Sequence, residues 1–188
     1  MKKIALFASG TGSNAKTIID YFKDHPSVYA DCLLSNKPGA KALEMAKNKG
    51  LDTRVIHKDE LDDPSTLLNY LQERGIDLIV LAGYLKRIPK EMVSAFPNKI
   101  INIHPALLPK FGGKGMYGMN VHKAVVEAGE EQSGMTIHYV NEHYDEGNII
   151  FQASCSLVES DRPEDVAAKV LQLEHRHYAE VIEKLLSE

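Results

Sequence analysis

The chain has 188 residues, of which 44% are hydrophobic and 26% are charged, as in ordinary globular proteins with one sizeable core. Its formal net charge is −4 and the signs are dispersed, which argues against nucleic acid or an anionic membrane as the principal partner. The two cysteines, Cys32 and Cys155, lie far apart in apolar runs, a pattern typical of reduced, buried thiols in a cytoplasmic protein. No motif with zinc-ligand spacing occurs, so we expect no metal site.

The amino-terminal end has some features of a signal peptide. Two lysines follow Met1, and a short apolar run follows the lysines. The segment Ser9–Gly12 interrupts this run too early for a signal peptide, and no other segment approaches the roughly 20 apolar residues of a membrane span. We therefore expect a soluble protein that stays in the cytoplasm.

The first hundred residues alternate between short apolar runs and segments with helical spacing. The apolar runs predict buried parallel strands at 3–8, 28–34, 53–57, 77–82 and 99–103. The spacing of apolar side chains predicts helices at 14–23, 40–49, 63–74 and 89–95. In the third of these helices, Asp63 is expected as the N-cap and Pro64 as the first helical residue. This alternation predicts an α/β fold with a doubly wound, mostly parallel sheet flanked by helices.

The pattern changes after residue 104. Residues 110–119 are rich in glycine and predict a mobile loop, followed by a helix near 120–128. Two further strands are expected at 135–140 and 148–158, joined by a polar loop as an antiparallel extension of the sheet. A long helix from 163 to about 186 closes the chain, and all 188 residues are expected to form one domain.

The first predicted strand leads into a glycine-rich turn and then into a helix. Gly10, Gly12 and Ala15 match a dinucleotide-binding spacing, but the second strand ends without the acidic residue that would hold a ribose. A monophosphate fits better, because Ser13 and Asn14 can add hydrogen bonds to those of the backbone N–H groups. The alternative is a plain tight turn in which a serine caps the helix.

Asn102 and His104 form a second candidate site at the end of the fifth predicted strand. Alternate residues of a strand share a face, so the amide and the imidazole point the same way, and Pro105 ends the strand directly after them. Such a pair can polarise a carbonyl and move a proton. The alternative is a strand end whose polar side chains only satisfy the backbone of the following turn.

Two carboxylates carry further hypotheses. Asp145 lies in the polar loop 141–147, where it is either a turn residue or the group that orients His104 and takes up a proton. Glu174 lies within the apolar stripe of the last helix, which is costly unless a ligand or a basic side chain meets it. His175 and His177 point to different faces of that helix and are expected to be surface and packing residues.

Four motifs together resemble the phosphoribosylglycinamide formyltransferase family, whose members use folate. They occur in that family's order over essentially the whole chain: Gly-Thr-Gly-Ser-Asn at 10–14, Leu-Ala-Gly-Tyr-Leu at 81–85, Asn-Ile-His-Pro-Ala-Leu-Leu-Pro at 102–109, and Asp145 in the loop after Thr-Ile-His-Tyr-Val at 136–140. The third motif is specific to formyl-transferring folate enzymes, and the first narrows the choice to the glycinamide ribonucleotide branch.

The resemblance implies transfer of a formyl group from 10-formyltetrahydrofolate, the co-substrate, to the amine of glycinamide ribonucleotide in purine synthesis. It implies that Asn102, His104 and Asp145 are catalytic. The nucleotide would be bound by Gly12, Ser13, Asn14, Lys110 and Glu174. The amino-terminal half would thus bind the phosphate, and the carboxyl-terminal half would supply the catalytic loop and part of the folate site.

The same resemblance places the folate along residues 82–88. Its pterin ring would lie against the backbone of this segment and of loop 139–145, with Leu85, Ile88 and Val140 as apolar walls. Asn102 would also contact the folate, and Lys86 or Arg87 would meet the glutamate tail or remain solvated. The loop 111–120 is longer and richer in glycine than in many relatives, so its contacts cannot be carried over beyond Lys110. A homodimer is compatible with the sequence.

Three other functions compete with this interpretation. Formyltetrahydrofolate hydrolase shares the Asn/His/Asp set but has an additional domain in front, and methionyl-tRNA formyltransferase has one behind; neither is expected in this chain. A non-catalytic module that binds a nucleotide phosphate would need the loop at 9–14, but it would have no use for Asn102, His104 and Asp145 together.

Overall fold

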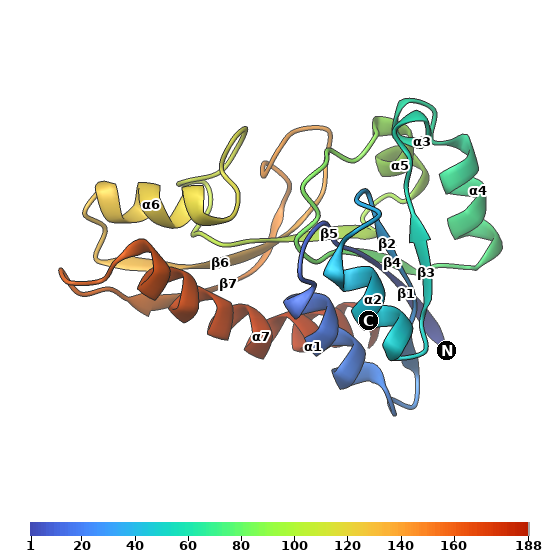
Figure 1. Cartoon of the computed structure of the whole chain (residues 1–188), viewed down its shortest axis with the longest axis horizontal. Coiled ribbons are helices and arrows are strands. Elements are labelled where there is room, and N and C mark those ends of the chain that lie inside the picture. The colour runs from blue at the N-terminus through green and yellow to red at the C-terminus, as the bar shows by residue number, and fades with distance from the viewer. Residues whose placement is uncertain (188) are drawn as a thin grey trace.

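Seven strands form one mixed sheet in a computed structural model that describes residues 1–187 (Figure 1). The strand order is β3-β2-β1-β4-β5-β6-β7. The first five strands pair in parallel, and β6 and β7 extend the sheet antiparallel, which confirms the predicted fold class. Their bounds are β1 Lys2–Phe7, β2 Val28–Ser35, β3 Asp52–Val55, β4 Leu78–Leu81, β5 Ile100–His104, β6 Gln132–Tyr139 and β7 Ile149–Ser156.

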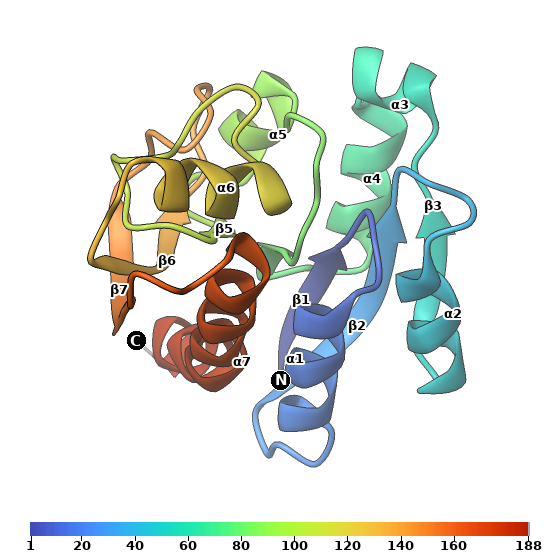
Figure 2. The ribbon, with the colours of Figure 1, turned by 60° about the vertical axis from the view of Figure 1, so that its left-hand side comes forward.

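Helices cover both faces of this sheet (Figure 2). Their bounds are α1 Ser13–Phe22, α2 Lys41–Asn48, α3 Lys58–Asp62, α4 Ser65–Glu73, α5 Lys90–Ala95, α6 Met119–Glu127 and α7 Pro163–Ser187. Each predicted helix is present, whereas the five-residue α3 was not predicted. The expected start of α4 is wrong by one position, because Pro64 is the N-cap and the Asp63 carboxylate accepts a hydrogen bond from the Ser65 N–H at 3.1 Å.

Two apolar clusters hold the layers together. In β1, Ile4 and Leu6 face one cluster with α1, α2, α6 and α7, while Ala5 and Phe7 face the other cluster with α4 and α5. Because both faces of β1 are buried, its sequence is a continuous apolar run rather than an alternating one. The long helix α7 packs beside α1 and across β6 (Figures 1 and 2).

The strand order reverses between β1 and β4, and the loops that follow these two strands are tied together there. The Ser9 N–H donates to the Gly83 carbonyl at 3.0 Å, and the Ser9 hydroxyl donates to Asn36 Oδ1 at 2.6 Å while it accepts from the Leu85 N–H at 2.9 Å. The Tyr178 hydroxyl of α7 donates to the Leu81 carbonyl at 3.0 Å. Ligands of doubly wound sheets bind at this kind of switch point, so the fold itself indicates where to look for a site.

None of the helices in residues 1–187 has the length and apolar character needed to cross a membrane. Within the same residues both cysteines are free: Cys32 is buried, as predicted, whereas Cys155 is only half-buried, contrary to the prediction. Burial raises the pKa of the Cys32 thiol to about 12, so this thiol is unreactive at neutral pH.

Candidate active site

The amino terminus of α1 forms an anion cradle. Gly12 precedes the helix with a φ of 78°, in the left-handed region that favours glycine, and no side chain caps the helix. A Cβ atom at Gly12 would lie 2.7 Å from the Ala42 Cβ, so the turn packs directly against α2. The first-turn N–H groups have no acceptor within the helix and carry the positive end of its dipole. This geometry supports a phosphate at residues 12–14.

Asn14 and Glu174 meet at one wall of a pocket of about 910 Å³. The Asn14 amide donates to Glu174 Oε2 at 2.7 Å, and both side chains are buried. The side-chain amide oxygen of Asn14, Oδ1, has no hydrogen-bond partner. Burial raises the pKa of Glu174, and the bond from Asn14 opposes this only in part. A ligand with hydroxyl groups would satisfy both side chains, in agreement with the argument from the helix spacing.

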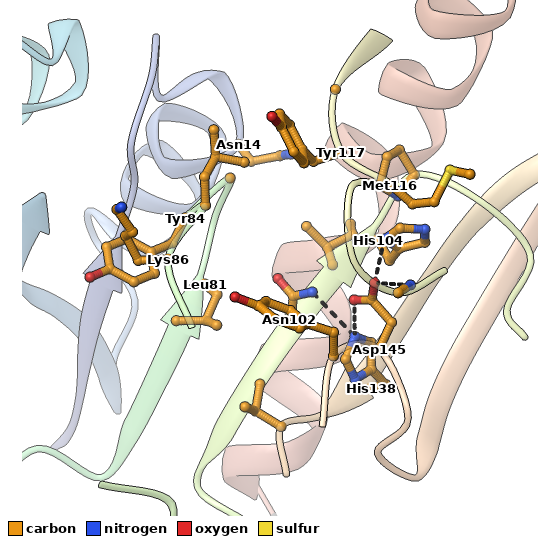
Figure 3. Close-up of a pocket in the computed structure, with 18 of the residues that line it drawn as sticks. Asn14, Leu81, Tyr84, Lys86, Asn102, His104, Met116, Tyr117, His138 and Asp145 are labelled. Atoms are coloured by element: carbon orange, nitrogen blue, oxygen red, sulfur yellow. Dashed lines mark hydrogen bonds and ion pairs between the residues drawn. The ribbon is translucent and has the colours of Figure 1, made fainter. Parts of the chain in front are cut away.

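His104 and Asp145 form the centre of the same pocket (Figure 3). His104 Nδ1 lies 3.5 Å from Asp145 Oδ2, and its Nε2 bonds to the Phe111 carbonyl at 2.8 Å. Because a carbonyl only accepts, Nε2 carries a proton. Burial lowers the pKa of His104, although Asp145 and the Phe111 carbonyl both act to raise it. The lowered pKa favours the uncharged ring, in which Nδ1 is the basic atom.

Asp145 is held as a carboxylate in a backbone conformation that few residues adopt. Its φ is 57°, and its Oδ2 accepts a hydrogen bond from the Gly113 N–H at 2.9 Å. Burial acts to raise the pKa of Asp145, but His138, His104 and the Gly113 N–H together lower it overall. A carboxylate beside a neutral imidazole stabilises the cation that forms when the ring takes a proton.

Asn102 completes the predicted catalytic set. It lies on the same face of β5 as His104, two residues away, and both line the pocket. Its Nδ2 lies 3.2 Å from Nε2 of His138, the residue directly opposite it on β6 (Figure 3). His138 Nε2 is also 3.6 Å from Asp145 Oδ1. The structure thus brings together Asn102, His104 and Asp145, as the sequence predicted.

The predicted folate residues line another wall of this pocket. Leu85, Lys86, Arg87, Ile88 and Val140 all face it. Leu85 is 47% exposed, so it presents apolar surface at this wall. The Arg87 guanidinium donates to the Glu142 carbonyl, so it contacts the loop that carries Asp145.

The structure corrects the expectation for Lys110. Its side chain is 66% exposed and pairs with Glu130 at 2.8 Å, beside a separate hollow of about 610 Å³. It therefore does not reach the nucleotide pocket. Gly12 and Ser13 also do not line the pocket wall, whereas their neighbours Thr11 and Asn14 do. Gly12 has no side chain, so any contact that it makes would come through its backbone.

Several pocket residues have no role in the sequence analysis, among them the buried histidines His122 and His138. His138 appears there only within a strand motif, and His122 does not appear. His122 lies on α6, is buried, and has no partner for its Nδ1. Burial lowers its pKa, and His104 adds to this effect. The signal for His138 was its register opposite Asn102, which needs the pairing of β5 with β6.

His177, which the sequence analysis treats as a surface or packing residue, does not add to the site. His177 packs against the Phe151 ring at 5.1 Å and does not line the pocket, as expected for a packing residue. Within residues 1–187, no three histidine, cysteine or acidic side chains gather closely enough to hold a metal ion.

Comparisons with known proteins agree with this geometry. The family model for formyl transferase matches residues 2–182. A chloroplastic phosphoribosylglycinamide formyltransferase from Arabidopsis thaliana is 46% identical over all of this chain, which spans 66% of that protein. A phosphoribosylglycinamide formyltransferase from Haemophilus influenzae is 40% identical, with 97% of this chain and 86% of that protein covered. The solved structure of glycinamide ribonucleotide transformylase 1 from Geobacillus kaustophilus superposes with a TM-score of 0.90 at 35% identity and covers 99% of both chains.

Proposed function

Because the chain belongs to the formyl transferase family, we propose that it transfers a formyl group from 10-formyltetrahydrofolate to the amine of glycinamide ribonucleotide. One observation carries this proposal. The amide of Asn102, the imidazole of His104 and the carboxylate of Asp145 share a pocket with Asn14, which belongs to the anion cradle at the start of α1. A nucleotide phosphate and a reactive carbonyl therefore have adjacent places in one pocket.

The pocket has the size and lining that two ligands require. Its volume of about 910 Å³ is near the upper end of the 300–1,000 Å³ that is typical of small-molecule sites. At one end, the helix terminus and the Asn14–Glu174 pair suit a phosphate and the ribose hydroxyls. At the other end, Leu85, Ile88 and Val140 suit a flat aromatic ring. Asn102 and His104 lie on β5 and Asp145 lies in the loop between β6 and β7, and all three line this same pocket.

The catalytic residues can carry out the transfer without a covalent enzyme intermediate. As the substrate nitrogen forms its bond to the formyl carbon, Asn102 is placed to stabilise the oxyanion. His104 takes the proton released by the amine and returns it to the departing folate nitrogen as the original carbon–nitrogen bond breaks. Asp145 stabilises the imidazolium between these two proton transfers.

The direct test is to incubate the purified protein with 10-formyltetrahydrofolate, with and without glycinamide ribonucleotide. We expect tetrahydrofolate to form only when the nucleotide is present, together with one equivalent of formylated nucleotide. Turnover without the nucleotide would indicate a hydrolase. Tight nucleotide binding with no turnover would indicate a binding module.

A further inference from the structure

Three residues of the glycine-rich loop contact both members of the His104–Asp145 pair through backbone atoms. The Phe111 carbonyl accepts a hydrogen bond from His104 Nε2 at 2.8 Å, and the Gly113 N–H donates to Asp145 Oδ2 at 2.9 Å. The same Oδ2 atom lies 3.5 Å from His104 Nδ1 (Figure 3). Residues 111–113, which we call the strap, therefore join the imidazole and the carboxylate in a closed ring of contacts.

The strap determines which nitrogen of His104 is available as a base. A carbonyl can only accept, so the bond to Phe111 places the ring proton on Nε2 and leaves the lone pair on Nδ1. The bond from Gly113 holds Asp145 Oδ2 beside that lone pair. A proton taken up at Nδ1 therefore meets a carboxylate that is already in place, so the transfer requires little reorganisation.

The backbone at both sides of these contacts has conformations that are rare for the residues present. Phe111 and Asp145 each have a φ of 57°, in the left-handed region that few residues other than glycine adopt. Such conformations persist where the surrounding structure imposes them, and they are frequent at functional sites. Gly113 has a φ of 92°, which requires glycine. Tertiary contacts, rather than local preference, thus set the path of the strap.

Gly112 is needed for space rather than for its backbone conformation, because its φ is not in the left-handed region. A Cβ atom there would lie 2.5 Å from Leu108 Cδ2 and 3.3 Å from the Asp145 Cβ. Leu108 is buried, and its backbone is fixed: its N–H donates to Thr136 Oγ1 and its carbonyl accepts from Gln152 Nε2, both at 3.0 Å. A side chain at position 112 would therefore push the strap and Asp145 apart.

We propose that the strap is a positioning element of the formyl transfer, and that Gly112 lets its backbone hold the His104 tautomer and the Asp145 carboxylate at the same time. The inference rests on the proposed function, because that reaction needs a base at Nδ1 beside a carboxylate. It also gives a role to part of the loop 111–120, for which the resemblance to relatives supplies no contacts. The strap acts through His104 and Asp145 and does not itself need to touch a substrate.

The tautomer of His104 is measurable in the wild-type protein, without any variant. With ¹⁵N-labelled histidine, NMR reports which ring nitrogens carry protons. We expect the uncharged ring of His104 to carry its proton at Nε2. A proton at Nδ1 of the uncharged ring would overturn the proposal, because the Phe111 carbonyl would then not hold the tautomer.

Two alanine substitutions separate contact with Asp145 from a general disturbance of the loop. Gly112→Ala adds a methyl group against Asp145 without backbone strain. We expect it to lower kcat by at least about tenfold, because misplacing reacting groups by about 1 Å can cost about 100-fold. KM values should change less than about threefold, since the strap does not bind the ground-state substrates.

Gly115→Ala is the matched control in the same loop. Its φ of 89° makes the alanine strained, but a Cβ atom there would meet nothing within 4 Å. We expect kcat of this variant to stay within about threefold of wild type, because strain alone does not move the pair. Equal losses of kcat in Gly112→Ala and Gly115→Ala, or no loss in Gly112→Ala, would overturn the proposal.

A double-mutant cycle tests whether Gly112 acts through His104. In a His104→Ala background, we expect Gly112→Ala to lower the single-turnover rate by less than about threefold, because the ring that the strap positions is gone. A further tenfold loss in that background would show that Gly112 acts by another route and would overturn the inference. If the wild-type protein has no transferase activity, the proposed function is wrong, whereas the tautomer measurement still tests the strap, so the two failures are distinguishable.

Discussion

Replacement of Gly12 by alanine tests how closely the anion cradle is packed. An alanine held at a φ of 78° costs about 1–2 kcal/mol, because its Cβ approaches the following carbonyl oxygen. The new methyl group would also lie 2.7 Å from the Ala42 Cβ and 3.0 Å from the Ala42 Cα, and such overpacking costs about 1–3 kcal/mol. We therefore expect the free energy of unfolding to fall by about 2–5 kcal/mol.

Gly10 provides the matched control. It lies two residues away in the same turn, its φ is not in the left-handed region, and a Cβ atom there would meet nothing within 4 Å. Gly10→Ala should leave stability unchanged or raise it by up to about 1 kcal/mol, since it restricts the unfolded chain. Urea unfolding followed by circular dichroism measures both variants under the same conditions.

A second substitution separates the two costs at Gly12. Ala42→Gly removes the methyl group that the new side chain would meet, although it costs about 1 kcal/mol as a glycine in α2. The double variant should be at least about 1 kcal/mol more stable than the sum of the single effects predicts. A Gly12→Ala variant within about 0.5 kcal/mol of wild type would refute the reasoning for a tightly packed cradle.

Three further predictions concern the site. His104→Ala should lower kcat by at least about 100-fold in steady-state assays, as expected for loss of an acid–base group, and a variant within tenfold of wild type would remove His104 from the mechanism. Asn14→Ala should raise KM for the nucleotide more than for the folate, and equal effects on both would contradict the placement of the phosphate. The raised pKa of Glu174 means that the folded state holds its proton more tightly than the unfolded chain does. The free energy of unfolding of wild type should therefore fall, relative to Glu174→Gln, as the pH rises from 4.5 toward neutrality. Urea unfolding of both proteins at pH 4 and pH 7 checks this sign, and a wild type that gains stability relative to the variant would contradict it.

Much of the fold could be predicted because both faces of the central strands are buried. Such strands are continuous apolar runs, and the helices between them show a stripe with a period of 3.6 residues. The helix α3 was missed because five residues are too few to show that period. The predicted start of α4 is one residue too early. The Asp63 carboxylate accepts a hydrogen bond from the Ser65 N–H, as an N-cap side chain would, although Pro64 is the N-cap.

The site residues also divide into those that a local sequence pattern predicts and those whose position depends on the tertiary structure. Asn102 and His104 follow from the period of two along one strand, and Glu174 follows from the apolar stripe of one helix. The contact of His138 with Asn102 depends on a cross-strand register with a residue 36 positions earlier, which no local pattern contains. Lys110 was misplaced because the direction of a loop side chain depends on the path of the whole loop.

The hydroxyl of Ser9 has a consequence for redesign of the pocket. It connects the loop that precedes the anion cradle to the backbone of Leu85 and to Asn36. An engineer who grafts a new loop after β1 to change the accepted nucleotide would therefore also disturb the wall where the pterin is proposed to lie. Keeping the serine, or replacing its two hydrogen bonds elsewhere, would be the first requirement of such a graft.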